Sequence, residues 1–240
     1  TTITLTYYHQ YKVTVQAQTT TSGTSLDSSN HVYGYANKTR TALAFNGENA
    51  YVRAPNTSSL EITEAITIEG WMKVNKLDVR QILYSDWNWP ADKRNVGLWM
   101  ESSNRVRFSI SSDGVNEDIL YSTTTLEAGR WYHLVGVFDG DYMYIYINGE
   151  LDASKDTELT SLYGLGDSKY LGRYTDYYLD GFISVFRIYN RALTADEIKH
   201  NYNNPQSPVT SGLVLWYNLD EGSGDIAHDR SGNGNHGTIY

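Results

Sequence analysis

The sequence predicts an all-β protein, an antiparallel two-sheet jelly-roll sandwich with one short helix. From Thr41 onward, short runs of β-branched and aromatic residues alternate with glycine-containing turns. One stretch near the end, "LTADEIKHNY", has the pattern of a helix. The 240 residues are enough for a single large sandwich, so length does not force a division into several cores.

We expect two parts along the chain. Residues 1–40 hold one or more N-terminal strands, in the β-favouring run Ile3–Val15, and then a Ser/Thr-rich linker. Residues 41–240 form the sandwich. Its strand signals follow one another in the segments "ALAFNG", "YVRA", "AITIEGWMKV", "RQILYS", "VGLWMESSNRVRFSI", "RWYHLVGVFDG", "YMYIYINGELD" and "DGFISVFRIYN".

Two local signals are specific. Asn148-Gly149 favours a type I′ hairpin turn, and the alternation before it places Met143, Ile145 and Ile147 on one face with tyrosines on the other. Thr194 followed by Glu197 three residues later predicts a helix that begins with a capping box. The helix should end before Asn203-Asn204-Pro205.

Composition excludes several function classes. The chain has 19 Lys and Arg against 28 Asp and Glu, a formal net charge of −9, which disfavours nucleic acid and anionic membrane surfaces as partners. No apolar run approaches the ~20 residues of a membrane span, so we expect no membrane insertion. Cysteine is absent, which excludes disulfides and cysteine-based zinc sites. The 21 tyrosines suit half-exposed sheet faces and contact surfaces, although tyrosine also simply favours strands.

Four segments, in this order, resemble the LamG-like jelly-roll domains of the concanavalin A-like lectin/glucanase superfamily. They are "ALAFNGENAYVRAP", "AITIEGWMKV", "GRWYHLVGVFDGDYMYIYINGELD" and "LDGFISVFRIYNRALTADEI", and together they cover most of residues 41–200. The resemblance implies a two-sheet sandwich, usually extracellular, that binds carbohydrate or another surface partner.

The C-terminal segment 212–240, which begins "GLVLWYNLDEGSG", resembles the opening segment of that family, and no such segment precedes Ala42. Two interpretations follow. Residues 212–240 supply the family's opening strand to the same sandwich, with "LVLWY" pairing beside "FISVFRIYN". Alternatively, they are the stub of a second, truncated repeat. We favour the first, because the apolar "LVLWY" needs burial.

The sequence predicts no catalytic residues. Glucanases of this fold carry closely spaced carboxylates on one face of a strand, and Glu61, Glu64 and Glu69 do not have that spacing. The six histidines show no metal-ligand spacing, and His133 lies within a strand pattern. We therefore interpret the chain as not an enzyme.

Two aromatic segments that we expect to be loops are candidate ligand sites. Rings stack on the apolar face of a sugar while polar neighbours bond its hydroxyl groups. The candidate residues are Trp87, Trp89, Asp86 and Asn88 in "SDWNWPADKRN", and Arg173, Tyr174, Asp176 and Tyr177 in "GRYTDYYLDG". Alternatively, these rings cap an open edge of the sandwich or contact other subunits.

The net charge disfavours polyanionic glycans. We expect neutral sugars, with Lys93, Arg94 or Arg173 available for one acidic substituent.

A candidate calcium site lies in "DRSGNGN". Asp229, Ser231 and Asn233 stand at alternate positions, as in the first half of an oxygen-rich calcium loop, and Asn235 can add a ligand. The closing bidentate glutamate of such loops is missing. The alternative is a Gly/Asn-rich turn that needs positive φ angles.

The sequence as a whole favours a non-catalytic carbohydrate-binding or adhesion module of a secreted or surface-exposed protein, with glycans or another surface protein as partner. We expect an extracellular, cell-surface or virion-surface location. "YYHQYKVTV" resembles segments of archaeal surface proteins, which favours a surface or viral origin. The alternatives are a structural or protein-binding module of a surface or virion assembly, and an accessory domain of a glycoside hydrolase or lyase.

Overall fold

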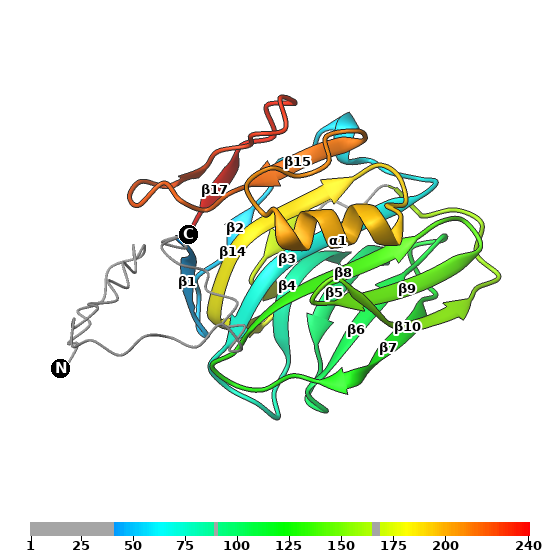
Figure 1. Cartoon of the computed structure of the whole chain (residues 1–240), viewed down its shortest axis with the longest axis horizontal. Helices are drawn as coiled ribbons and strands as arrows, with labels where there is room; N and C mark the ends of the chain where they lie inside the picture. The colour runs from blue at the N-terminus through cyan, green and yellow to red at the C-terminus, as the bar shows by residue number, and fades with distance from the viewer. Residues whose placement is uncertain (1–40, 89–90, 165–168) are drawn as a thin grey trace, which may run out of the picture.

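The computed structural model describes residues 41–88, 91–164 and 169–240. Two antiparallel sheets pack face to face, and one α-helix lies against the outer face of one of them (Figure 1). The predicted all-β sandwich with a short helix is confirmed. The strand expected within residues 3–15 lies outside the described residues.

The seven-stranded sheet carries the helix. Its strands, in spatial order, are β1 (Leu43–Asn46), β14 (Asp180–Tyr189), β3 (Ile66–Val74), β8 (Trp131–Phe138), β9 (Tyr142–Ile147) and β10 (Glu150–Asp156), and β15 (Leu213–Tyr217) also pairs with β14. The helix is α1 (Ala195–Asn203), and a short 3-10 turn, η1 (Ser58–Leu60), lies between β2 and β3.

The eight-stranded sheet forms the other layer. Its strands, in spatial order, are β16 (Ile226–Ala227), β17 (Gly237–Ile239), β2 (Val52–Arg53), β11 (Lys169–Leu171), β4 (Gln81–Asn88), β5 (Lys93–Met100), β6 (Arg105–Ile110) and β7 (Asp118–Thr125). A small hairpin, β12 (Arg173–Tyr174) and β13 (Tyr177–Tyr178), forms a separate two-stranded sheet. Sequence reasoning missed β7, since its Ser/Thr-rich end alternates weakly. It also missed the short strands β11, β12, β13, β16 and β17, whereas "YVRA" correctly indicated β2.

The C-terminal segment joins both sheets. β15 pairs with β14, with Phe186 opposite Tyr217 and Ile188 opposite Leu215. Leu215 and Tyr217 are fully buried in the main core. Farther along, β17 pairs with β2 in the other sheet. The predicted pairing of "LVLWY" beside "FISVFRIYN" is therefore confirmed.

The predicted turn and capping box are also confirmed, whereas the helix extends through Asn203, one residue beyond its expected end. Asn148 and Gly149 have φ angles of 54° and 79°, as a type I′ turn requires at both positions. Met143, Ile145 and Ile147 face the main core. Thr194 accepts a hydrogen bond from the Glu197 amide and Glu197 returns one to the Thr194 amide, which is a complete capping box.

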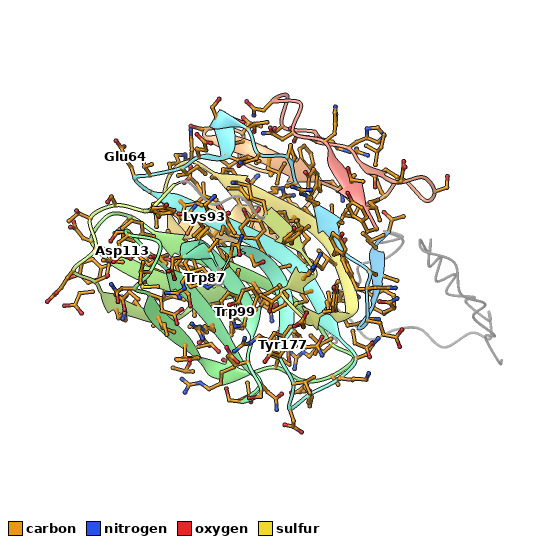
Figure 2. The ribbon with its side chains drawn as sticks, turned by 180° about the vertical axis from the view of Figure 1, so that it is seen from behind. Glu64, Trp87, Lys93, Trp99, Asp113 and Tyr177 are labelled. Carbon is orange, nitrogen blue, oxygen red and sulfur yellow. The ribbon has the colours of Figure 1, made fainter. Side chains whose placement is uncertain are left out.

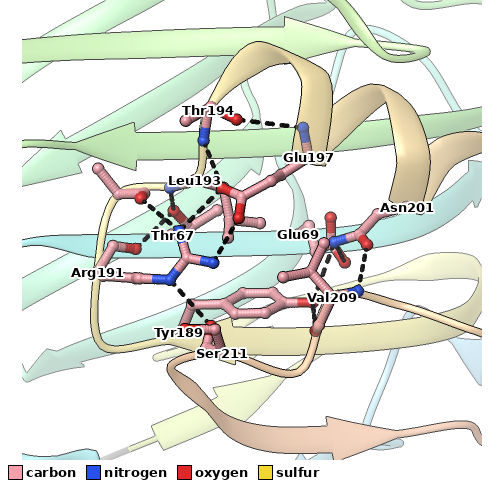
Figure 3. Close-up of polar contacts among 11 residues, drawn as sticks. Thr67, Glu69, Tyr189, Arg191, Leu193, Thr194, Glu197, Asn201, Val209 and Ser211 are labelled. Atoms are coloured by element: carbon pink, nitrogen blue, oxygen red, sulfur yellow. Dashed lines mark hydrogen bonds and ion pairs between the residues drawn. The ribbon is translucent and has the colours of Figure 1, made fainter.

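A buried polar network holds α1 on the seven-stranded sheet (Figure 3). Glu69 of β3 and Arg187 of β14 form an ion pair of 2.5 Å with both side chains 1% exposed. His133 Nε2 lies 3.3 Å from the second Glu69 oxygen. From the helix, Asn201 Nδ2 donates to Glu69 Oε1 at 3.1 Å and to the Tyr189 hydroxyl at 3.0 Å. Burial alone would raise the pKa of Glu69, but the Arg187 charge and the His133 contact outweigh it and lower that pKa to about 2.

The segment between α1 and β15 forms hydrogen bonds with the same network. Asn201 Oδ1 accepts from the Val209 amide at 2.8 Å, and Arg187 also donates to the Pro205 carbonyl. At the helix start, Arg191 pairs with both oxygens of Glu197 and donates to the Ser211 carbonyl (Figure 3). The helix thus positions the linker that leads into β15.

Candidate functional site

The outer face of the eight-stranded sheet carries a broad group of aromatic side chains. Alternation along β5 puts Val96, Leu98 and Met100 in the main core, which leaves Gly97 and Trp99 on the opposite face. Figure 2, seen from behind, shows Trp87, Trp99 and Tyr177 following one another across this part of the molecule. The β12–β13 hairpin packs over β4 here, where the Ser85 hydroxyl donates to the Arg173 carbonyl at 2.8 Å.

One part of this face is a column of four rings, which we name the Trp99 stack: Trp87, Trp99, Tyr174 and Tyr177. Trp87 meets Trp99 edge-on, with centroids 6.0 Å apart at 82°. Tyr174 is parallel to Trp99 at 5.7 Å, and Tyr177 is parallel to Tyr174 at 6.4 Å. Trp99 lies flat over Gly97, where a Cβ would stand only 2.0 Å from the indole ring. A side chain at position 97 would therefore displace the stack.

Charged groups frame the Trp99 stack. Glu101 accepts hydrogen bonds from Trp99 Nε1 at 2.8 Å and from Arg80 Nε at 3.2 Å, and Arg107 lies 3.3 Å away. Burial would raise the pKa of Glu101, but these hydrogen bonds and the two arginine charges outweigh it and lower the pKa. The Arg80 guanidinium lies 4.6 Å from the ring of Tyr177, which is 47% exposed. The stack therefore ends in an exposed ring beside a cation.

The structure corrects the expectation that "SDWNWPADKRN" is an exposed loop. Trp87 is only 4% exposed, and its position in β4 pairs with Arg94 of β5. The strand pairing continues to Asn88 opposite Lys93, so the described residues on both sides of the segment belong largely to paired strands rather than to a loop. Trp87 is buried because Trp99 and Tyr174 form a small apolar cluster with it on this face.

Asp86 also does not lie at the surface beside the aromatic rings, where the predicted ligand site requires it. Asp86 comes just before Trp87 in β4 and pairs with the core residue Val96, so strand alternation turns its side chain away from the Trp99 stack. Its side chain is 1% exposed, accepts from Asn95 Nδ2 at 2.8 Å and lies 3.6 Å from Lys169 Nζ. Asn88 is half-buried. Trp89 lies outside the described residues.

A second group of rings surrounds Arg173, and we name it the Arg173 cluster: Arg173, Tyr51, Tyr170, Tyr178 and Tyr240. The Arg173 guanidinium carbon lies 4.7 Å from the Tyr51 ring, 5.1 Å from Tyr170 and 5.5 Å from Tyr178. Tyr240 is stacked on Tyr51 at 4.6 Å and is 48% exposed. The three half-buried rings and the exposed fourth ring form a surface with a cation at its centre.

The segment "GRYTDYYLDG" is the two-residue hairpin β12–β13 rather than an irregular loop, with Thr175 in the left-handed region at φ 48°. The hairpin links the two groups of rings. Arg173 belongs to the cluster, Tyr174 and Tyr177 belong to the stack, and Asp176 is exposed at the turn. The two predicted segments thus meet, because Trp87 and Tyr174 both contact Trp99.

Sequence reasoning missed several members of this surface. Trp99 was expected only as a strand residue, and Tyr51, Tyr170 and Tyr240 were not singled out. Tyr51 and Tyr170 each precede a core residue, Val52 and Leu171, in short strands, and that alternation places them on the outer face. No local signal connects Tyr240 with Tyr51, which are brought together by the β17–β2 pairing.

The four predicted calcium ligands do lie together, in a loop that we name the Asp229 clasp. Asp229 Oδ1 accepts from the Trp216 and Ser231 amides, both at 2.9 Å, and Oδ2 accepts from Ser231 Oγ at 2.8 Å and the Asn235 amide at 2.9 Å. Asn233 Nδ2 donates to the Leu213 carbonyl at 3.3 Å. Donors thus surround both carboxylate oxygens, an arrangement that caps a loop and does not fit a cation without rearrangement. Calcium binding stays a prediction.

The carboxylates considered for catalysis are not assembled. Glu69 is buried against Arg187, whereas Glu61 and Glu64 are exposed on the segment before β3. Within the described ranges, no group of three or more Asp, Glu or His side chains could hold a metal ion. The part of the chain that the structure describes also has no helix long and apolar enough to cross a membrane.

Comparison with solved structures finds the same architecture in binding proteins. A proposed carbohydrate-binding protein from Bacteroides ovatus has a TM-score of 0.66 and 21% identity, over 82% of this chain and 57% of that one. The CBM40 of the Ruminococcus gnavus IT-sialidase, bound to α2,3-sialyllactose, has a TM-score of 0.55 and 18% identity, over 66% of this chain and 95% of that one. The binding domain of botulinum neurotoxin serotype G has a TM-score of 0.55 and 16% identity, over 68% of this chain and 42% of that one.

The chain thus spans less than two thirds of the Bacteroides protein, and at these identities the likeness establishes the fold. No curated protein matches the sequence. A family model, Laminin_G_3, described as the concanavalin A-like lectin/glucanases superfamily, matches residues 46–199. Those residues are more than half of the chain and include the sandwich strands from β2 to β14. The chain belongs to the Laminin_G_3 family of the concanavalin A-like lectin/glucanase superfamily.

Proposed function

We propose that this chain is a non-catalytic carbohydrate-binding module whose ligand lies on the outer face of the eight-stranded sheet. The observation that carries the proposal is the Arg173 cluster together with the exposed end of the Trp99 stack. Tyrosine rings offer apolar faces for the C–H face of a sugar, and their hydroxyl groups offer hydrogen bonds. The similarity to a carbohydrate-binding protein and to a sialyllactose-bound module supports it.

The proposed site is displaced from the one that the sequence suggested. Tyr177 and Tyr240 are the exposed rings of the two groups, at 47% and 48%, whereas Trp87 supports Tyr177 from below through Trp99 and Tyr174. Stacking on each ring contributes about 0.5–1.5 kcal/mol beyond its area. A site of this kind binds weakly when alone, and multivalent display compensates for that.

A glycan array tests the proposal. The protein is displayed as a streptavidin tetramer, and wild type is compared with Tyr177→Ala and Tyr240→Ala. Tyr142→Ala is the matched control, since Tyr142 is 46% exposed but lies in β9 of the other sheet. We expect wild type to bind a defined set of glycans, at least one of the two sheet-face variants to lose signal, and the control to retain it. A wild type that binds no glycan, or loss only in Tyr142→Ala, contradicts the proposal.

We also propose an extracellular or surface location, which suits a glycan-binding module. The alternatives are a protein-binding module of a surface or virion assembly and an accessory domain of a glycoside hydrolase or lyase. The array separates the first alternative, because a protein-binding face shows no glycan preference. An intact gene with a neighbouring catalytic domain would favour the second.

A further inference from the structure

We propose that the saccharide bound at this face carries a carboxylate and that Arg173 is the residue that pairs with it. The inference rests on the proposed function and names its ligand class. It starts from the charge state of the Arg173 cluster, because a guanidinium is always ionised and is seldom covered by protein without an acidic partner.

Among the described residues, Arg173 has no carboxylate partner. Its Nε donates to the Thr175 carbonyl at 3.2 Å, and its other contacts are the faces of three tyrosine rings. The arginines of the neighbouring Trp99 stack differ, since Arg80 and Arg107 both pair with Glu101. Arg173 is therefore a half-buried cation whose charge the described protein leaves uncompensated.

The bonding of Arg173 leaves a specific pair of donors for a ligand. Nε is occupied by the Thr175 carbonyl, and no hydrogen bond of Nη1 or Nη2 to a described residue is present. These two nitrogens form a planar fork that matches the two oxygens of a carboxylate. The surrounding rings fix the plane of the guanidinium, so the fork is held in place before a ligand arrives.

The local charge around the cluster is complementary to one anionic group. Arg53 is exposed on the same face, opposite Tyr170 in the β2–β11 pairing, and it too has no ion-pair partner among the described residues. Asp176 at the hairpin turn is the acidic residue nearest in sequence to Arg173, and it is exposed. The whole chain nevertheless has a net charge of −9, which repels polyanions. A neutral sugar with one carboxylate fits both the unpaired positive charge of the cluster and the negative charge of the whole chain.

The test compares acidic saccharides with their neutral counterparts. The probes are 3′-sialyllactose and a glucuronic acid disaccharide, each alongside the same sugar with its carboxyl group reduced to an alcohol. Affinities are measured by isothermal titration or by ligand-observed NMR. We expect at least one acidic probe to bind about tenfold more tightly than its reduced form, because hydrogen bonds to a charged group are stronger than those to a neutral one. Raising NaCl from about 50 to about 500 mM should weaken only the acidic probe.

Variants assign the preference to Arg173. Arg173→Gln should remove the difference between acidic and reduced probes, and Arg173→Lys, which keeps the charge but loses the fork, should retain part of it. Arg130→Gln is the matched control, since the Arg130 guanidinium lies 5.3 Å from the Tyr132 ring, just before β8 of the other sheet. Melting temperatures of all variants show whether the fold is intact. If Arg173→Gln does not fold, the affinities of Arg173→Lys and the salt dependence of wild type decide whether Arg173 pairs with the carboxylate.

The outcomes separate this inference from the proposed function. An array that shows binding of neutral glycans alone overturns the carboxylate inference and leaves the carbohydrate-binding function standing. Acidic glycans that bind folded Arg173→Gln as well as wild type overturn the role of Arg173. A wild type that binds no glycan overturns both.

Discussion

The buried Glu69–Arg187 pair should be a large single contributor to stability, and Glu69→Gln tests it. The substitution keeps the shape of the side chain but leaves Arg187 as a buried cation without its charge partner. Breaking a buried ion pair by removing one partner costs about 3–5 kcal/mol. The pKa gives a second estimate: its fall from 4.5 to about 2 corresponds to about 3 kcal/mol of stabilisation of the ionised form. For a chain of this size, that lowers the melting temperature by about 10 °C.

The assay is urea unfolding at several pH values, with Glu197→Gln as the control. Glu197 also has a pKa lowered to about 2, mainly by its hydrogen bond to Arg191, but its side chain is 27% exposed. Glutamine preserves the capping box there, so Glu197→Gln should cost about 1 kcal/mol or less. Comparing the losses of unfolding free energy in Glu69→Gln and Glu197→Gln separates the effect of burying an ion pair from the effect of forming one.

The pH dependence has a definite sign. The pKa of Glu69 is lower in the folded chain than in the unfolded one, so its contribution is complete above about pH 5 and is lost as pH falls towards 2. The stability gap between wild type and Glu69→Gln should therefore narrow as the solution is acidified. A loss below about 1 kcal/mol at pH 7, or a gap that does not change between pH 6 and pH 3, would refute the reasoning.

Three further predictions concern the rings and the C-terminal segment. Trp87→Ala should lower the free energy of unfolding by about 3–5 kcal/mol, measured in urea, because it leaves a cavity beside Trp99; unchanged stability would mean that the ring is not part of a packed cluster. Removal of residues 207–240 should abolish cooperative thermal unfolding or lower the melting temperature strongly, because it uncovers the β14 edge and deletes the fully buried Leu215. A melting temperature equal to that of the full chain would contradict the pairing of β15 with β14. Asp229→Ala should lower the melting temperature in calcium-free buffer, because it removes the hydrogen bonds of the Asp229 clasp. A second measurement adds calcium to metal-stripped wild type: a rise in melting temperature supports calcium binding, and a constant melting temperature contradicts it.

The local features of this protein were determined by the sequence alone. Alternation identified the faces of β9, Asn148-Gly149 specified its turn, and Thr194 with Glu197 specified the start of α1. These signals act over a few residues, because backbone conformation and capping depend on near neighbours in the chain. The resemblance of "LVLWY" to the family's opening segment, together with its need for burial, favoured a place beside "FISVFRIYN", and β15 does pair with β14.

The composition of the surface was decided only by the tertiary structure. Trp87 and Tyr177 look alike in the sequence, as aromatic residues in polar segments, yet Trp87 is 4% exposed and Tyr177 is 47% exposed. The difference arises because an extra residue in β4, Leu83, shifts the strand alternation so that Trp87 lies on the outer face, where Trp99 and Tyr174 cover it. Tyr51, Arg173 and Tyr240 likewise come from three distant parts of the chain and meet only when β2 pairs with both β11 and β17. Such contacts depend on which strands become neighbours, and that choice is set by burial over the whole sandwich rather than by any short segment.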